Sequence, residues 1–464
     1  MARAATTPKS RKAGTRAKAP KRPVVMKFGG SSLAPRPRDA EQALKESITG
    51  RVEPSKATYL MFKRALDRAT VARFAEVARH IASAVEKGNQ AVVVVSAIGD
   101  TTDELIALAE DVTAEPDLRE LDMLVVTGEQ QSAALMAITL NALHCPAVSL
   151  TGGQAGILAE AVPGRAHIRS VHPDRIRREL SQGKVVVVAG FQGITEQDAA
   201  ADVTTLGRGG SDASAAALAV ALDAECNIYT DVAGVYTADP RIVPTAKLLR
   251  RMCYDEMLEL ASHGAKVLQE RAVEIAARAK IPIRVRSSFD LADPGTVIGP
   301  AEEMQMEEQP AIRGLACEKD VGMVAIRKIA NKPGIAAAIF KALDAAAINV
   351  DVIVQPGDVA QPVDISFSVG GKDLERAHQA VKSVAKSLGA SRVEKIAGLA
   401  KVSVVGLGLH SRPGIAHRVF ATLAEAGINI VAITTSEIRI TCVVEEQYAD
   451  QAVQMLHEVF ELHR

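Results

Sequence analysis

The sequence contains no tryptophan, and phenylalanine and tyrosine together make up only 3% of its 464 residues. Its 55 lysine and arginine residues match its 55 aspartate and glutamate residues, so the formal net charge is zero. A chain balanced in this way has no overall attraction to nucleic acid or to an anionic membrane. It also lacks an apolar run of the roughly 20 residues that a membrane-spanning helix needs. We therefore expect neither nucleic acid nor a membrane as a partner.

Cysteine is scarce as well. The five cysteines are Cys145, Cys226, Cys253, Cys317 and Cys442, and no two of them form a Cys-x-x-Cys pair. Their odd number and scattered spacing argue against a disulfide framework and against a zinc site. No histidine pattern accompanies any of them, which argues against a catalytic thiol. We expect buried free thiols in a reducing compartment, and so a cytoplasmic location.

The first 22 residues carry eight basic side chains, no acidic one, and no large aliphatic residue beyond Met1. Such a stretch cannot bury enough apolar surface to fold by itself. We predict a disordered basic tail over residues 1–22. A transit peptide is the alternative, although the amphipathic apolar face of such peptides is missing.

Apolar runs alternate with helical patterns over residues 23–299. The strands expected are Val24–Lys27, Ala91–Ser96, Met123–Thr127, Val148–Thr151, Val185–Ala189, Ile228–Asp231 and Ile283–Ser287. The helices expected are Val71–Val85, Glu129–Leu143, Pro173–Gln182, Ala213–Asp223 and Tyr254–Ala279, with helical spacing also over Lys56–Arg68. This alternation predicts one α/β domain, with a mostly parallel sheet between two layers of helices.

Two glycine-rich stretches interrupt this pattern. In Thr204–Ser214, three glycines surround Arg208, and a helix beginning near Ser211 would direct free N–H groups into the loop. The earlier stretch, Lys27–Ser32, places a lysine beside two glycines and two serines at a strand end, where α/β sheets hold phosphates. Neither is a P-loop or a dinucleotide fingerprint. Each alone also fits a tight strand-to-helix connection, but together they indicate two anion-binding turns.

Residues 35–70 form a polar insertion directly after the first glycine turn. A lid over the neighbouring site and a simple surface excursion are both compatible with its sequence.

The last third of the chain contains an internal repeat. Residues 300–311 are acidic and bounded by proline, which predicts a linker or a connecting helix. Beyond them Lys332–Ala336 returns as Arg412–Ala416, a shift of 412 − 332 = 80 positions. Each copy predicts a strand, a Pro-Gly turn, a helix, an Ile-Asn turn and a second strand. The Pro-Gly turn suits a small carboxylate ligand and equally suits a plain helix cap.

Seven segments, in order along the chain, resemble motifs of the aspartate kinase family within the amino-acid-kinase superfamily. They are Lys27–Ser32, Ser96–Glu104, Thr127–Glu129, Thr205–Asp212, Thr230–Val232, Gly234–Arg241 and Gly264–Leu268. The repeat is similar to the two ACT domains that follow the kinase domain in that family. The resemblance implies an αβα sandwich kinase domain at 23–299, followed by ferredoxin-like βαββαβ domains at 312–396 and 397–464.

The resemblance also implies roles for individual residues. Lys27, Arg208 and Asp212 would be catalytic: Lys27 on the phosphate oxygens, Arg208 on the α-carboxylate of aspartate, and Asp212 holding Lys27 in place. The ATP-binding residues would be Lys27, Phe28, Gly29, Gly30, Thr230, Asp231, Tyr236, Thr237, Ala238, Asp239, Pro240, Arg241 and Lys266. The substrate-binding residues would be Ser31, Ser96, Thr102, Glu129, Arg208, Gly209, Gly210 and Ser211, with Glu129 on the ammonium group.

Four of these residues have an ordinary structural interpretation. Glu129 would be an acid in the first turn of a helix, Asp231 and Asp239 would be turn residues, and Lys266 would be a solvated lysine. We interpret them as functional because they occur together and in the family's order.

The implied reaction is phosphoryl transfer from ATP to the β-carboxylate of L-aspartate, the first step towards lysine, threonine and methionine. This nucleophile has a pKa of about 4 and is already ionised at neutral pH, so the site needs no general base. The task is to bring two anions together by positioning and charge neutralisation. Mg²⁺ would sit mainly on the ATP phosphates rather than in a protein site.

ACT pairs in this family bind end-product amino acids and form dimers, which implies a homo-oligomer inhibited by lysine, threonine or both. The effector-binding residues would be Asn331, Pro333, Gly334, Ile335, Ala336, Asn349, Val350, Asp351 and Gln355, facing Ser411, Ile415, Ala416, Asn429, Ile430, Thr435, Ser436 and Glu437 across a dimer or within the chain. Two alternatives remain: another carboxylate kinase of the superfamily, and an inactive amino-acid sensor. The paired repeat argues against the first, and retention of Lys27, Arg208 and Asp212 against the second.

Overall fold

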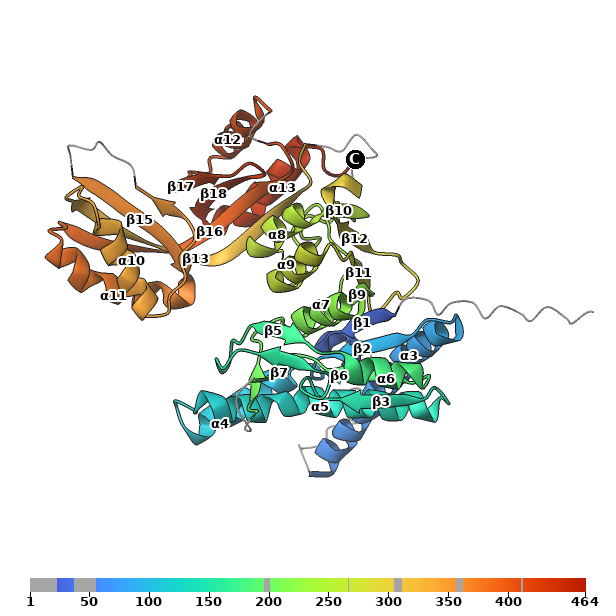
Figure 1. The fold of residues 1–464 in the computed structure, drawn as a ribbon. Helices are drawn as coiled ribbons and strands as arrows, with labels where there is room; N and C mark the ends of the chain where they lie inside the picture. Colours follow the sequence, from blue (N-terminus) through green and yellow to red (C-terminus); the bar gives the residue numbers. More distant parts are fainter. Residues whose placement is uncertain are drawn as a thin grey trace, which may run out of the picture.

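A computed structural model of the chain describes residues 23–36, 56–195, 201–265, 267–303, 311–355, 362–409 and 412–464, with only the backbone of residues 56–66 and 303 (Figure 1). The predicted basic tail, most of the 35–70 insertion, Lys266 and Ser411 lie outside the described residues. The described chain builds a large mostly parallel sheet, a small sheet beside it, and a separate antiparallel sheet.

The large sheet has the strand order β10-β12-β11-β9-β1-β2-β6-β3. Its strands are β1 (Val24–Phe28), β2 (Ala91–Val95), β3 (Ala147–Leu150), β6 (Val185–Ala189), β9 (Glu225–Thr230), β10 (Arg251–Cys253), β11 (Ile283–Ser287) and β12 (Thr296–Gly299). β1 lies between β2 and β9 and is parallel to both. The chain therefore leaves β1 towards one side and later returns on the other, so the carboxyl ends of these strands meet at a switch point, where α/β sheets bind ligands.

Helices cover both faces of this sheet, and successive side chains of β1 point to opposite faces. Met26 and Phe28 pack with α3 (Lys56–Glu86) and α5 (Leu118–Ala142), whereas Val25 packs with α7 (Gly210–Leu222). Lys27 therefore points towards α7. On the α7 face lie also α6 (Asp174–Ser181), α8 (Tyr254–Ser262) and α9 (Glu270–Ala279). The predicted α/β sandwich is confirmed.

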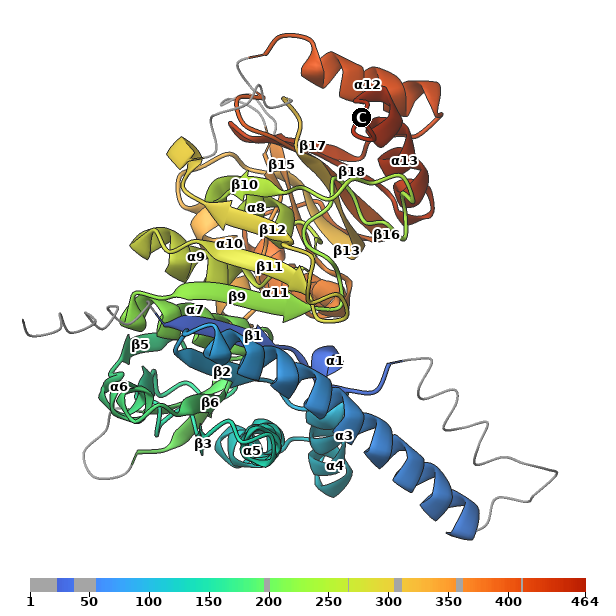
Figure 2. The same cartoon turned by 90° about the vertical axis from the view of Figure 1, so that its right-hand side faces the viewer.

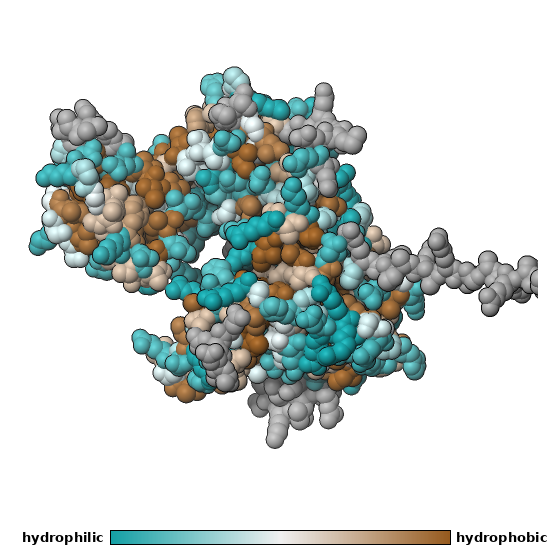
Figure 3. Space-filling view, in the orientation of Figure 1, coloured by the Kyte–Doolittle hydropathy of each residue, from teal (hydrophilic) through white to brown (hydrophobic). Residues whose placement is uncertain are grey.

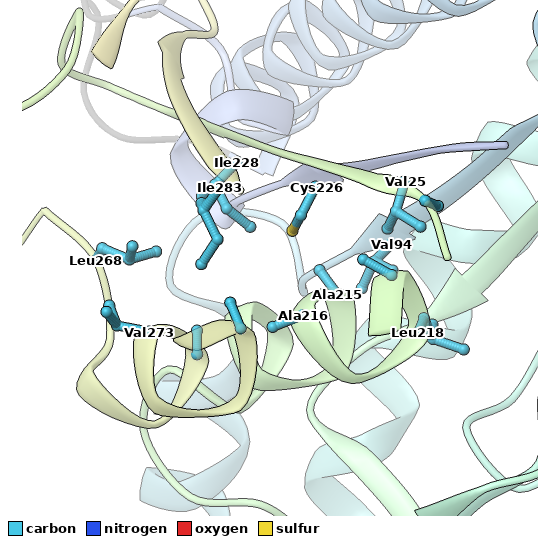
Figure 4. Packing of buried hydrophobic residues seen from close by; sticks show 14 of the residues in the cluster. Val25, Val94, Ala215, Ala216, Leu218, Cys226, Ile228, Leu268, Val273 and Ile283 are labelled. Atoms are coloured by element: carbon cyan, nitrogen blue, oxygen red, sulfur yellow. The ribbon is translucent and has the colours of Figure 1, made fainter. Parts of the chain in front are cut away.

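Six of the 13 residues of α7 are alanine, and the helix is buried almost along its whole length. Short side chains let its backbone approach the sheet closely, so that Ala215 and Ala216 pack beneath Cys226 of β9 (Figure 4). A helix seated this firmly gives its N-terminal turn a fixed position at the carboxyl edge of the strands.

Two predicted elements are wrong. Met123–Thr127 is not a strand but part of α5, which begins after Asp117; the Asp117 carboxylate caps it by accepting from the N–H groups of Arg119 and Glu120. The β-branched pair Val125 and Val126 suggested a strand because short apolar runs do not separate the two periodicities. Tyr254–Ala279 is not one helix either, because Gly264 (φ +110°) separates α8 from α9.

The predicted helices over Lys56–Arg68 and Val71–Val85 form one continuous helix, α3, so the second half of the insertion is helical. Sequence analysis missed the small sheet of order β5-β4-β7-β8, whose strands are short. They are β4 (Ile157–Ala159), β5 (Ile168–Val171), β7 (Gln192–Thr195) and β8 (Val203–Thr205). Two short helices, α1 (Gly30–Leu33) and α4 (Thr101–Val112), follow β1 and β2.

The two repeats share one antiparallel sheet of order β14-β15-β13-β16-β18-β17 (Figure 2). Its strands are β13 (Gly314–Ile329), β14 (Ile353–Val354), β15 (Val363–Gly370), β16 (Arg392–Val405), β17 (Ala432–Thr435) and β18 (Arg439–Glu445). Helices α10 (Ile335–Ala345) and α11 (Leu374–Ser387) cover one half, and α12 (Ile415–Glu425) and α13 (Ala449–Val459) the other. β13 and β16 run through both halves, so the boundary expected between residues 396 and 397 falls inside β16.

All five cysteines are free thiols, and four of them are buried. No helix in the described residues is long and apolar enough to span a membrane. On the face seen in Figure 3, hydrophilic and hydrophobic residues alternate in small groups.

Candidate active site

Lys27 and Asp212 form an ion pair at the centre of the molecule. The Lys27 Nζ atom lies 2.6 Å from Asp212 Oδ1, and both side chains are 11% exposed. Lys27 comes from the carboxyl end of β1 and Asp212 from the first turn of α7. The two glycine-rich stretches, 185 positions apart (212 − 27) in the sequence, therefore meet in one pocket.

The first glycine turn is packed too closely for any larger residue. A Cβ atom on Gly30 would lie 2.7 Å from the Ala97 carbonyl oxygen and 3.1 Å from that of Gly99. Gly128, on α5, is limited in the same way, because a Cβ atom added there would lie 2.8 Å from the Cβ atom of Ala97. These contacts hold the turn after β1 against the turn after β2. Gly29 is different, because its Cβ atom would face Lys27 Nζ at 3.3 Å and so enter the pocket itself.

Glu129 is buried beside this pair of turns. It is 3% exposed, and its Oε1 atom accepts a hydrogen bond of 3.0 Å from the Ala97 N–H. Its Oε2 atom is buried and has no hydrogen-bond partner among the described residues. Burial raises the pKa of Glu129 to about 7. Because Glu129 lies in the middle of α5, the first-turn interpretation is wrong. A buried carboxylate with one free oxygen suits a cationic ligand group.

Arg208 and Gly209 lie on the exposed loop before α7. Gly209 has φ +71°, and Arg208 has no ion-pair partner among the residues that the structure describes. Ser211 is buried at the start of α7, whereas Ser31 is exposed. The substrate residues expected at Ser96 and Thr102 are half-buried, at the end of β2 and the start of α4. The geometry leaves the Arg208 guanidinium free to bind an anion.

Asp122 holds the second glycine stretch in place and was missed by sequence analysis. Its buried carboxylate accepts hydrogen bonds from the Thr205 N–H (3.0 Å) and hydroxyl (2.7 Å), from the Thr204 hydroxyl (3.2 Å) and from the Gly164 N–H (3.0 Å). These bonds tie β8, which leads directly into Leu206–Gly210, to α5. Nothing in the sequence indicated this role, because a lone aspartate carries no pattern that marks it as buried.

Arg73 is a second positioning residue without a sequence signal, since an arginine in an amphipathic helix usually faces water. It is 3% exposed, and its Nε atom donates to the Ser32 carbonyl at 2.7 Å. Its guanidinium also donates to the Ser288 carbonyl and lies 4.9 Å from the centre of the Phe289 ring. Arg73 thus connects α3, the first glycine turn and the end of β11.

The predicted nucleotide segments have two different environments. Thr230 donates to Asp231 (3.0 Å) at the open carboxyl end of β9, and Asp239 pairs with Arg241 at 2.7 Å on the surface. Tyr236 is half-buried and Pro240 is exposed. Among the other residues assigned to ATP, Phe28 is fully buried in the core rather than in the pocket.

Thr237 and Ala238 are buried against the six-stranded sheet instead. The Thr237 hydroxyl lies 3.0 Å from His457 Nε2 on α13, and its carbonyl accepts from the Leu315 N–H at 2.8 Å. Ala238 packs in the hydrophobic cluster formed with α12 and α13. The side chains of both residues therefore contact the sheet that carries the two repeats and join the two parts of the molecule.

The segments predicted to bind an effector begin at two equivalent turns. Gly334 and Gly414, before α10 and α12, both have φ +93°. Val352, which directly precedes the edge strand β14, belongs to one small apolar cluster, and Ala432 of the edge strand β17 packs against the same cluster. Of the predicted effector residues, Asp351 is already paired with the buried Lys401.

A charged network joins this region to α8. Lys401 Nζ lies 2.6 Å from Glu318 Oε2 and also pairs with Asp351. Arg439 of β18 lies 3.4 Å from Glu259 Oε2 of α8, and Ser436 donates to the same Glu259 at 3.4 Å.

Comparison with known proteins identifies the family. Residues 22–287 match the amino acid kinase family, and residues 325–384 and 402–460 each match an ACT domain. An aspartokinase from Geobacillus stearothermophilus is 48% identical over 394 residues, covering 85% of this chain and 94% of that protein. E. coli aspartokinase III in complex with aspartate and ADP (R-state) superposes with a TM-score of 0.74 at 26% identity, covering 94% and 99% of the two chains. Its complex with lysine and aspartate (T-state) gives 0.66 at the same identity and coverage. The chain therefore belongs to the aspartokinase branch of the amino acid kinase family.

Proposed function

We propose that this aspartokinase transfers the terminal phosphoryl group of ATP to the β-carboxylate of L-aspartate in the pocket around Lys27. The observation that carries the proposal is the Lys27–Asp212 pair, because it places a fixed positive charge between two glycine turns at the carboxyl edge of the sheet. The aspartate and ADP bound by E. coli aspartokinase III support aspartate as the phosphoryl acceptor and an adenine nucleotide as the second ligand of this chain.

The reaction needs charge neutralisation rather than proton transfer. A β-carboxylate oxygen forms a bond to the γ-phosphorus, and the bond from that phosphorus to the bridging oxygen breaks, leaving its electron pair on ADP. Lys27 stabilises the phosphoryl oxygens, with Asp212 fixing its position. Arg208 binds the α-carboxylate, and Glu129 binds the ammonium group through its unpartnered oxygen. Both contacts hold the α-carbon end of aspartate, which leaves the β-carboxylate at the other end to face the phosphate.

Magnesium belongs to this proposal as a partner of the nucleotide. The described residues contain no group of three or more His, Cys, Asp or Glu placed to hold a metal ion. Asp212 is already paired with Lys27, so the donors present fit a Mg²⁺ ion carried by ATP phosphates and water. When bound, the ion would neutralise phosphate charge.

Feedback inhibition by lysine, threonine or both, and assembly into a homo-oligomer through the ACT domains, complete the proposal. The lysine bound in the T-state structure of E. coli aspartokinase III supports an amino-acid effector. The contacts of Thr237 and Ala238 with the sheet that carries the ACT domains offer a direct route from that sheet to the nucleotide segment.

The test is an assay of aspartate hydroxamate formation with ATP, Mg²⁺ and hydroxylamine, which traps the acyl phosphate. Hydroxamate that requires both ATP and aspartate supports the kinase assignment. Equal or greater yield with glutamate in place of aspartate would contradict it. Repeating the assay with lysine and with threonine tests the regulation separately, since saturation curves unchanged by either amino acid would remove only that part.

A further inference from the structure

A second polar pocket lies on the opposite face of the large sheet from Lys27. It is an open hollow with a volume of about 640 Å³, lined by α3, the strands β1, β9 and β11, and the loop at Leu291 and Ala292. α3 covers β1 and β2 on this face, leaving β9 and β11 beside it (Figure 2). The volume falls within the range of small-molecule sites, about 300–1,000 Å³.

The sequence of β9 and β11 shows why this face is polar. In a sheet covered on both faces, parallel strands are apolar throughout. Here Asn227 and Tyr229 of β9 alternate with buried apolar residues, and Arg284 and Arg286 of β11 do the same. The register pairs Arg284 with Asn227 and Arg286 with Tyr229, so their polar side chains line the pocket as neighbours.

The pocket is cationic. Arg284, Arg286 and Lys87 line it, and Glu225 is the only carboxylate among its described lining residues, so three positive charges minus one negative leave two positive charges. Arg286 donates to the neutral Tyr229 hydroxyl (3.1 Å) and to carbonyls of the loop, and its positive charge also helps to lower the pKa of Asp293. Arg284 has one long hydrogen bond, 3.4 Å, to a backbone carbonyl.

A neutral histidine forms the wall opposite the arginines. His80 of α3 lies with its Nε2 atom 2.9 Å from the Tyr229 hydroxyl. Burial, Arg286 and Lys87 together lower the pKa of His80 to about 4. Burial is the largest cause, and the charges of Arg286 and Lys87 add to it; a bound anion would offset the part that comes from these two charges.

We propose that this pocket is a binding site for a small oxyanion of two or more charges, of the phosphate or polycarboxylate class. Arg284 and Lys87 supply the charge-assisted hydrogen bonds, and Arg286, Tyr229 and Asn227 form the polar floor. The site is separate from the Lys27 pocket, since Lys27 faces α7 on the other side of the sheet.

The test follows the His80 imidazole by NMR in the full-length protein, with its signal assigned from His80→Gln. Sodium phosphate is titrated at constant ionic strength, and citrate is titrated in a parallel series. We expect a saturable shift of the His80 signal and a pKa above its value of about 4, because a bound anion favours imidazolium. The anion with the higher apparent affinity, phosphate or citrate, shows whether the site favours the phosphate or the polycarboxylate class. A shift that grows linearly without saturation, or no shift, would overturn the proposal.

Variants of the lining residues test whether the anion binds in this pocket. Arg284→Gln and Lys87→Gln should each weaken the apparent affinity by about tenfold, the change that follows from losing one hydrogen bond to a charged group. Arg278→Gln, which removes an exposed arginine from the last turn of α9 outside the pocket, is the matched control and should change nothing. Lys27→Met should also leave the His80 response intact. Loss of the response in Lys27→Met, or equal affinity in all variants, would place the anion elsewhere and refute the site.

Discussion

The catalytic turn at Gly30 and the ACT-domain turns at Gly334 and Gly414 use the same residue for different physical reasons. A side chain at Gly30 would collide with the backbone of Ala97 and Gly99. At Gly334 and Gly414 nothing lies within 4 Å of a Cβ atom, but both have φ +93°, which L side chains rarely adopt. The first turn is limited by space and the other two by conformation. Substitutions should therefore affect catalysis in one region and only stability in the other.

The largest effect is expected at the charge that the first turn supports. Lys27→Met keeps the length of the side chain and removes its charge, so kcat should fall by roughly 10³-fold. The hydroxamate assay measures this loss, and circular dichroism checks that the variant is folded. Lys341→Met, at an exposed position on α10, is the matched control and should retain the wild-type rate. A Lys27→Met variant as active as that control would end the assignment of Lys27 as a catalytic residue.

Gly30→Ala should be next in size. One methyl group must displace the Ala97 carbonyl or the turn itself, and a displacement of about 1 Å near a reacting group costs on the order of 10²-fold in rate. We expect kcat/KM for ATP to fall by about that factor, and the melting temperature to fall as well, because the methyl group meets backbone atoms. If kcat/KM stays at the wild-type value, the turn accommodates the methyl group without displacing the reacting groups. The distinction between Gly30 and Gly334 would then fail.

A smaller effect is expected in the pH dependence of kcat/KM for aspartate, which should depend on Glu129 in the catalytic region and not on the ACT-domain turns. The pKa of Glu129 is raised to about 7, so the carboxyl is neutral below that pH and ionised above it. Only the ionised form attracts the substrate ammonium group. We therefore expect kcat/KM for aspartate to fall about tenfold per pH unit below pH 7, and Glu129→Gln to give a lower and flat profile. If kcat/KM falls with the same slope below pH 7 in the wild type and in Glu129→Gln, a group other than Glu129 titrates.

Sequence analysis predicted the αβα sandwich because buried strands such as Ala91–Val95 are continuous apolar runs. It paired Lys27 with Asp212 only through the family resemblance, since 185 positions separate them. It missed Asp122 and Arg73 because their roles depend on burial, and a lone charged residue in a helix carries no periodic signal for being buried. It also assigned Thr237 and Ala238 to the nucleotide, whereas their side chains contact α13 and its neighbours. Local sequence patterns do not contain the contacts between segments that are far apart in the sequence.

The smallest effect is expected at the ACT-domain turns. Gly334→Ala and Gly414→Ala place a side chain in open space but in a left-handed conformation that costs about 1–2 kcal/mol. Each should lower the melting temperature of the ACT part by about 2–8 °C, at about 2–4 °C per kcal/mol for a part of roughly 150 residues, and leave kcat and KM without effector at the wild-type values. Gly334→Asn is the matched variant, because asparagine tolerates this conformation better than alanine and should lose less. Equal losses for alanine and asparagine would show that side-chain volume limits the turn, and the distinction between limits of space and of conformation would then fail. A fall in kcat for Gly334→Ala without effector would show instead that strain in this turn reaches the pocket around Lys27.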